Sequence, residues 1–482
     1  MHSAVSESPL TLHEDRVFDA EPSVRRIARE LYAETRALPL VCPHGHVDPR
    51  WLAEDAPFPE PASLLITPDH YITRMLYSQG VPLDSLGVKP RDGSAYDVDG
   101  RAIWRRFAER ATLFRGTPSG YWLDHELHEL FGVRVVLDAQ SADAVYDAIA
   151  ERLRSPEYRP RALFDRFNIE VLATTDAATD TLAHHASIRA SGWKGRVIPA
   201  FRPDRLMQVA SPAWKATVEM LGSQCSVTID SVGALVDAIA VRRAVFAAAG
   251  ATATDHGVEE PFTARLSPAE CGAIWERGMR GMATDADQRM LTGHLLMEMA
   301  RLSHADGLVM QLHAGSYRNH NRQLFDRFGP DIGADIPVAT EFTRNLAPLL
   351  NEFGNSSALT LILFTLDEST YARELAPLAG HYPAVRLGPA WWFHDSINGM
   401  TRYREWTTET AGIWNTAGFT DDTRAFCSIP ARHELSRRVD ANVLARMVSR
   451  HIIDLRDARG MAHAMAYGLA KAAYKLDEPV TP

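Results

Sequence analysis

Short apolar runs recur along most of the chain, and nearly all of them stop abruptly at polar or charged residues. Such runs are typical of strands that are buried on both faces of a parallel sheet. The pattern predicts eight strands: 38–42, 169–176, 196–202, 251–256, 308–313, 359–367, 385–393 and 419–422. Helical patterns separate most of them, so strands and helices are expected to alternate.

Apolar residues at helical spacing predict a first helix at 22–36, before the first strand. The interval from about 50 to 165 has little β character and is expected to be helical. Thr67 followed by Pro68 predicts one helix start there, because an N-cap residue precedes a proline at the first helical position. Further helices are expected at 101–113, 124–130, 142–154, 180–190, 287–303, 338–353, 371–379 and 442–454.

Eight strands that alternate with helices predict an α/β fold, a distorted (β/α)8 TIM-like barrel. We expect residues 1–37 to form an N-terminal helical lead-in. Residues 38–482 would form the barrel, interrupted by a helical insertion at about 50–165. The main alternative is an open doubly wound sheet, which would more often have a glycine-rich turn after an early strand. No such turn follows an early strand here.

Composition narrows the possible partners and location. A net charge of −10 over 482 residues argues against nucleic acid or an anionic membrane as a partner. The four cysteines are scattered and form no C-x-x-C pair, as expected for reduced thiols in the cytoplasm. The first residues lack a signal-peptide pattern, and no apolar run approaches the length of a membrane span. We therefore expect a cytoplasmic protein without membrane or nucleic-acid partners.

The first apolar run ends in His44-Gly45-His46. Side chains two positions apart on an extended strand project to the same face, so both imidazoles could bind one divalent metal. The motif is short, and a pair of loop histidines that hydrogen-bond locally is the alternative.

In a parallel barrel, the residues at the strand ends meet at the C-terminal mouth. That mouth would gather His44, His46, Asp176, Arg202, Asp255, His256, His313, Asp367, Trp391 and Asp421 or Asp422. A carboxylate from the last strand could complete a metal site of two histidines and one carboxylate. Asp422 is favoured for this role because Arg424 follows at the same strand end. Helix caps or loop ion pairs are the alternative for Asp176, Asp367 and Asp421.

Three arginines, Arg202, Arg318 and Arg424, follow predicted strands. A guanidinium binds a carboxylate or phosphate through two parallel hydrogen bonds, so three of them at one mouth favour an anionic substrate. At least one of them could instead pair with a neighbouring aspartate. Trp391 and Trp392 are adjacent, so on a strand only one of them would line the pocket.

Together these motifs resemble the uronate isomerase (glucuronate isomerase) family of the amidohydrolase superfamily, over nearly the whole chain. The resemblance rests on His44-Gly45-His46, Thr67-Pro68-Asp69-His70-Tyr71 with Arg74, Thr174-Thr175-Asp176, Phe201-Arg202-Pro203-Asp204, Asp255-His256-Gly257, residues 310–319 and 329–333, Trp391-Trp392-Phe393-His394-Asp395, and Asp422-Thr423-Arg424 continuing to Arg432-His433-Glu434. It implies an amidohydrolase-type barrel with a helical insertion after the first strand. The family usually has Asp-Ser-Arg where this chain has Asp422-Thr423-Arg424.

The resemblance implies interconversion of D-glucuronate and D-fructuronate, and of D-galacturonate and D-tagaturonate, in hexuronate catabolism. The reaction moves a proton from C2 to C1 through a cis-enediol. The implied cofactor is a divalent metal, Zn²⁺, held by His44, His46 and Asp422. The implied catalytic residues are His70, Tyr71, Asp422 and Arg424, and the implied substrate-binding residues are Arg202, Asp255, His313, Arg318 and Trp391. A homo-oligomer is also expected, since the mid-chain helices leave surface for one.

Two other functions stay open. A metal-dependent amidohydrolase of the same superfamily would act on an amide or lactone of an anionic substrate. Against it, no bridging lysine is evident at the fourth strand, and the histidines after strands five and six do not form the usual second metal set. A barrel that only binds sugar acids is the third possibility, but it should have lost some of the chemically reactive mouth residues, and none is lost here.

Overall fold

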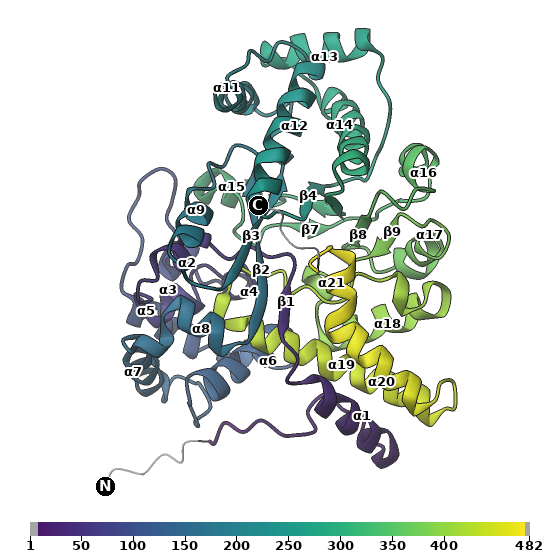
Figure 1. The fold of residues 1–482 in the computed structure, drawn as a ribbon. Coiled ribbons are helices and arrows are strands. Elements are labelled where there is room, and N and C mark those ends of the chain that lie inside the picture. Colours follow the sequence, from purple (N-terminus) through teal and green to yellow (C-terminus); the bar gives the residue numbers. More distant parts are fainter. Residues whose placement is uncertain (1–7, 478–482) are drawn as a thin grey trace.

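The computed structural model describes residues 8–477. Seven parallel strands form one curved sheet in the order β1-β2-β3-β4-β5-β8-β9 (Figure 1). Their bounds are β1 (Leu40–Cys42), β2 (Ile169–Ala177), β3 (Arg196–Arg202), β4 (Ala253–Val258), β5 (Val309–Ala314), β8 (Leu361–Thr365) and β9 (Val385–Leu387). A separate antiparallel pair consists of β6 (Ser316–Tyr317) and β7 (Ile336–Pro337). The predicted alternation of parallel strands and helices is confirmed.

The eighth predicted strand, 419–422, is wrong as a strand. Gly418 and Asp422 have φ values of +74° and +39°, which interrupt an extended ladder. The segment 416–424 nevertheless takes the place of a strand. The Ala417 amide donates to the Leu387 carbonyl of β9 (2.7 Å), and the His46 amide donates to the Thr423 carbonyl (2.9 Å). This closing segment, 416–424, therefore bridges the two edges of the sheet.

The predicted helical insertion lies between β1 and β2, and its helices gather on one side of the sheet (Figure 1). They are α2 (Pro49–Glu54), α3 (Pro61–Leu65), α4 (His70–Ser78), α5 (Gly100–Ala108), α6 (Pro118–His125), α7 (Ala142–Leu153) and α8 (Pro160–Arg166). The helix start predicted at Thr67 is wrong. Helix α4 begins at His70, because the Asp69 carboxylate caps it by accepting from the Tyr71 amide (2.8 Å).

The remaining helices precede β1 or follow β2. They are α1 (Pro22–Thr35), α9 (Ala183–Ala190), α10 (Asp204–Met207), α11 (Trp214–Cys225), α12 (Val232–Ala248), α13 (Pro268–Met279), α14 (Asp285–Asp306), α15 (Arg322–Phe328), α16 (Ala347–Phe353), α17 (Ala376–Ala379), α18 (Ile397–Ala411), α19 (Ile429–Ser449), α20 (Leu455–His463) and α21 (Leu469–Ala473). Helices α11 to α14 gather at the top of Figure 1. No helix within residues 8–477 is long and apolar enough to span a membrane.

Helix α19 differs most from the prediction, which placed a helix at 442–454. It starts at Ile429 and is buried on nearly all sides, packed against α1, α18 and α20. Charged residues such as Arg404 and Asp440 are buried there as pairs, with Nε–Oδ1 and Nη2–Oδ2 distances of 2.7 and 3.0 Å. Paired buried charges leave no apolar stripe, so the periodicity of the sequence does not reveal this helix.

We expect Arg404→Ala to destabilise the protein by about 3–5 kcal/mol, because it leaves the buried Asp440 carboxylate unpaired. The shift of the urea midpoint, multiplied by the m value, measures the effect. The control is Arg322→Ala, which removes an exposed pair with Asp326 and should change the midpoint little. Equal shifts in the two variants would contradict a stabilising role for the buried pair.

Candidate metal centre and active site

The structure brings together the three residues predicted as metal ligands. His44 and His46 follow β1, and Asp422 lies in the closing segment. The Nε2 atoms of His44 and His46 lie 3.3 and 3.2 Å from Oδ1 of Asp422. His44 is buried, whereas the side chain of His46 is 27% exposed, so one side of the triad opens toward solvent.

These distances fit a shared metal better than hydrogen bonds. A charge-assisted N–H···O bond is about 2.7–2.9 Å long, whereas two N or O ligands of one tetrahedral zinc lie about 3.3–3.5 Å apart. In the described part of the chain, neither Oδ1 of Asp422 nor Nδ1 of His44 has a hydrogen-bond partner, although both are buried. Three protein ligands would leave a fourth position open for substrate or water.

A second set of predicted residues packs against His44. His313 stacks on the His44 ring at 4.6 Å, and its Nδ1 lies 2.7 Å from Oδ1 of Asp255. Arg202 pairs with the other Asp255 oxygen at 3.4 Å and with Asp204 at 2.7 Å. Burial opposes ionisation of Asp255, but Arg202, then His313, hold its pKa well below its usual range. The contacts of Asp255 with both residues fix the orientation of His313 and of Arg202 at the mouth.

Tyr71 and His70 approach from the first turn of α4. The Tyr71 hydroxyl lies 3.0 Å from Oδ2 of Asp395, to which Arg432 also donates at 3.2 Å. The His70 ring lies 5.5 Å from the Trp392 ring. Burial, reinforced by Arg424, lowers the pKa of His70 to about 3, so its imidazole is neutral near pH 7. A neutral imidazole can both accept and donate a proton.

Asp395 is a site residue that the sequence argument named only within a motif. Burial raises its pKa to about 7, and no described group bonds to its buried Oδ1. It lines a small cavity together with Trp391, Trp392 and Asp422. A carboxyl group between the predicted tyrosine and the predicted metal ligand is a functional candidate. In the sequence, only its position after a predicted strand could have indicated that Asp395 lies at the site.

The other predicted residues at the mouth differ in their exposure and in their contacts with neighbouring side chains. Arg318 pairs with Asp335 at 2.8 Å, but its side chain is 40% exposed, and its guanidinium lies 5.0 Å from the Trp392 ring centroid. Trp391 packs at 4.7 Å against His313. The prediction that only one tryptophan lines the pocket is wrong, since Trp391 and Trp392 both line the small cavity. They do not lie on a strand, because β9 ends at Leu387.

Several strand-end residues serve structure instead. The Asp176 carboxylate accepts from Thr174 at 2.7 Å, and Asp367 accepts from the Thr340 amide at 3.0 Å. His256 is a buried core histidine whose Nδ1 meets the Gln311 carbonyl at 2.8 Å. Asp176 and Asp367 thus form hydrogen bonds with nearby groups, whereas the alternative for them was a helix cap or a loop ion pair.

Comparison with known proteins connects this site to a family. The glucuronate isomerase family model matches residues 21–473. A uronate isomerase from Phenylobacterium zucineum is 54% identical over 98% of both chains. Among solved structures, the glucuronate isomerase from Caulobacter crescentus superposes with a TM-score of 0.96 at 50% identity and covers 98% of both chains. A uronate isomerase from Thermotoga maritima gives 0.89 at 27% identity, over 96% of this chain and 99% of that one.

Loss of one metal ligand should release one metal ion per chain. We expect Asp422→Asn, which keeps the size but removes the charge, to weaken binding at this centre by at least about tenfold. Metal content after dialysis, measured by plasma mass spectrometry, reports the loss. Asp367→Asn, another strand-end carboxylate, is the matched control. Retention of wild-type metal content by Asp422→Asn would remove this residue from the ligand set.

Glu126 lies behind this site, near Asp69 and Arg432, and burial raises the pKa of its carboxyl from about 4.5 to about 8. Between these values the folded chain holds a proton that the unfolded chain has lost. Stability should therefore fall as the pH rises through this window. Relative to wild type, we expect Glu126→Gln to gain stability between pH 5 and pH 8.5, on the order of a few kcal/mol.

Urea denaturation of wild type and Glu126→Gln at the two pH values gives this difference directly. Glu109→Gln, at an exposed glutamate, is the control and should show no such gain. A Glu126→Gln variant whose stability follows wild type at both pH values would show that the glutamate does not titrate in this way.

Proposed function

The chain belongs to the glucuronate isomerase family, and we propose that its metal triad, His70 and Tyr71 together interconvert D-glucuronate and D-fructuronate. D-Galacturonate and D-tagaturonate are the second proposed substrate pair. The observation that supports this most strongly is the convergence at one mouth of the His44, His46 and Asp422 triad with His70 and the Tyr71–Asp395 pair. These residues come from four segments: the turn after β1, helix α4, the loop after β9 and the closing segment.

The reaction sets the demands on the site. The sugar ring must open, and the C2 proton must move to C1 through a cis-enediol. Sugar C–H groups are weak acids, so a base must lie within about 3 Å of the proton. Donors must also stabilise the charge that develops on O1 and O2.

Two imidazoles and one carboxylate fit a divalent metal, and we propose Zn²⁺ as its identity. When bound, the metal would supply positive charge to the sugar oxygens at the mouth. His44 would be held rigidly for this role by its stacking on His313. His46, on the more exposed side, would face the substrate.

His70 and Asp422 are the proposed proton carriers. The neutral imidazole of His70 can take the hydroxyl proton that must leave as the ring opens. Burial opposes ionisation of Asp422, but His44 and His46 hold its pKa well below its usual range, so the carboxylate is ionised near pH 7. Its Oδ1 faces the imidazoles, which leaves Oδ2 to accept the C2 proton.

Tyr71 and Arg424 would stabilise the enediol. Burial, then the neighbouring Asp395 charge, raises the pKa of Tyr71 well above its usual range, so the hydroxyl stays protonated and can donate to O1 or O2. Arg424 lies close enough to His70 to influence its pKa, and it would offer its guanidinium to the same oxygens. Both groups act as donors, as an enediolate requires.

We assign the uronate carboxylate to Arg202 and Arg318. Arg202 already pairs with Asp204 and Asp255, so Arg318, with one aspartate partner and an exposed side chain, is the freer of the two. Asp255, His313 and Trp391 would complete the pocket wall. The net charge of −10 supports the prediction that nucleic acid is not a partner. A homo-oligomer and a cytoplasmic location stay predictions.

Proton NMR of the purified protein with D-glucuronate in D2O tests the proposed reaction. We expect a ketose to appear, with deuterium at the transferred position to the extent that the shuttled proton exchanges with solvent. Unchanged glucuronate and galacturonate, together with hydrolysis of amides or lactones, would instead establish the amidohydrolase alternative.

Removing either proposed group on α4 should lower turnover. We expect His70→Asn and Tyr71→Phe each to reduce kcat by at least about 10²-fold, the typical contribution of one acid–base group. The matched controls, His304→Asn on an exposed helix end and Tyr403→Phe in the core, should stay close to wild type. Near-normal kcat in either α4 variant would exclude that residue from the mechanism.

A further inference from the structure

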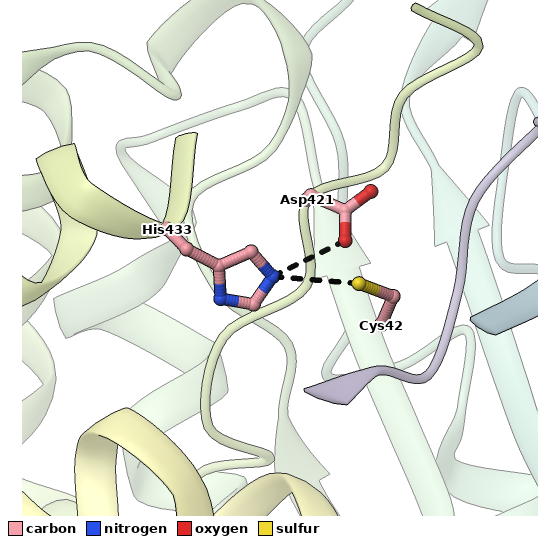
Figure 2. Close-up of side chains that lie close together, drawn as sticks. All are labelled: Cys42, Asp421 and His433. Atoms are coloured by element: carbon pink, nitrogen blue, oxygen red, sulfur yellow. Dashed lines mark hydrogen bonds and ion pairs between the residues drawn. The ribbon is translucent and has the colours of Figure 1, made fainter. Parts of the chain in front are cut away.

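Cys42, Asp421 and His433 form a second cluster of metal-binding side chains (Figure 2). Cys42 ends β1, Asp421 lies in the closing segment, and His433 lies near the start of α19. His433 Nε2 is 3.6 Å from Cys42 Sγ and 3.3 Å from Asp421 Oδ2. All three potential ligand atoms lie within 4.8 Å of one another. In Figure 2, one nitrogen of His433 faces both the Cys42 sulfur and one oxygen of Asp421.

These separations match the edges of a zinc tetrahedron. With Zn–S near 2.3 Å and Zn–N near 2.0–2.1 Å, a sulfur and a nitrogen on one ion lie about 3.6 Å apart. A nitrogen and a carboxylate oxygen on the same ion lie about 3.3–3.5 Å apart. The two measured distances therefore allow both contacts to be ligand–ligand contacts around one ion.

Two groups of this cluster compete for one nitrogen atom of His433. His433 Nε2 has either one proton or one lone pair, yet it faces both the Cys42 sulfur and the Asp421 carboxylate. If it donates to Asp421, the Cys42 thiol must find its acceptor on the same carboxylate; if it accepts from the thiol, the carboxylate faces a lone pair. Of the two Asp421 oxygens, Oδ1 is buried and lacks a hydrogen-bond partner within the described chain.

The charge of the cluster is also unbalanced. The side chains of Asp421 and His433 are 0% and 4% exposed, and Cys42 is fully buried. Within residues 8–477, the ion-pair partner of Asp421 is His433. A buried carboxylate whose ion-pair partner is a histidine is costly unless that histidine is protonated. A dication bound by one thiolate, one carboxylate and one neutral imidazole would make the site electrically neutral.

We propose that Cys42, Asp421 and His433 form a second, structural metal site that takes Zn²⁺ or a similar thiolate-binding dication. On binding, the thiol proton leaves to solvent and the sulfur becomes the ligand. The ion would join β1 to the closing segment and the start of α19, which lie far along the chain from β1. It would thereby fix the backbone next to Asp422. This site stands on its own residues and does not depend on the isomerase chemistry.

Cobalt(II) distinguishes the two metal sites, because only the Cys42 site has a sulfur ligand. The full chain is stripped with a chelator and reloaded with CoCl2. We expect two cobalt ions per chain and a near-ultraviolet thiolate-to-cobalt charge-transfer band. Cys42→Ser should lose the band and one cobalt. Asp422→Asn should also lose one cobalt but keep the band.

Cys427→Ser is the matched control, because Cys427 is also buried, at 2% exposure, and lies outside the cluster. It should keep the band and both cobalt ions. A wild-type chain with no band, or a band that survives Cys42→Ser, overturns the proposal. If Cys42→Ser does not fold, His433→Gln replaces it. The loss of one cobalt and of the wild-type band in His433→Gln would then support the proposal, and an unchanged band would overturn it.

Discussion

The closing segment, 416–424, is the constraint on which the site depends. It is held at one end by the Ala417–Leu387 bond to β9 and at the other by the bond from the His46 amide to the Thr423 carbonyl. The second bond joins the turn after β1, which contains the proposed metal ligands His44 and His46, directly to the residue after Asp422. This bond limits how far the Asp422 carboxylate can move relative to the two imidazoles. The same segment gives its adjacent carboxylates to different partners, since Asp421 meets Cys42 and His433.

Arg432 connects this segment to the tyrosine side of the site. Its Nη1 donates to the Asp421 carbonyl and to Oδ2 of Asp395, both at 3.2 Å, and its guanidinium lies 3.6 Å from the centroid of the Trp122 ring. Tyr71 bonds to the same Asp395 oxygen. A single buried arginine on α19 therefore sets the positions of groups from the helical insertion, from the loop after β9 and from the closing segment.

The sequence predicted the parts of this structure that repeat a pattern. Buried parallel strands are continuous apolar runs, so β2 and β3 were located closely. The choice of Asp422 over Asp421 followed from Arg424 and matches the observed grouping. The start of helix α19 was not predicted, because its buried ion pairs interrupt the apolar stripe that marks a helix. Asp395 was not predicted as a site residue. Its role depends on a hydrogen bond from Tyr71, which is distant in sequence and reaches it only in the folded chain.

The central claim is that one metal ion is held between the turn after β1 and the closing segment. Crystals grown without chelator, with diffraction recorded at the zinc absorption edge, test it most directly. The account predicts an anomalous peak about 2.0–2.2 Å from Nε2 of His44, Nε2 of His46 and an oxygen of Asp422. A metal-loaded protein with no peak between these three residues would contradict it.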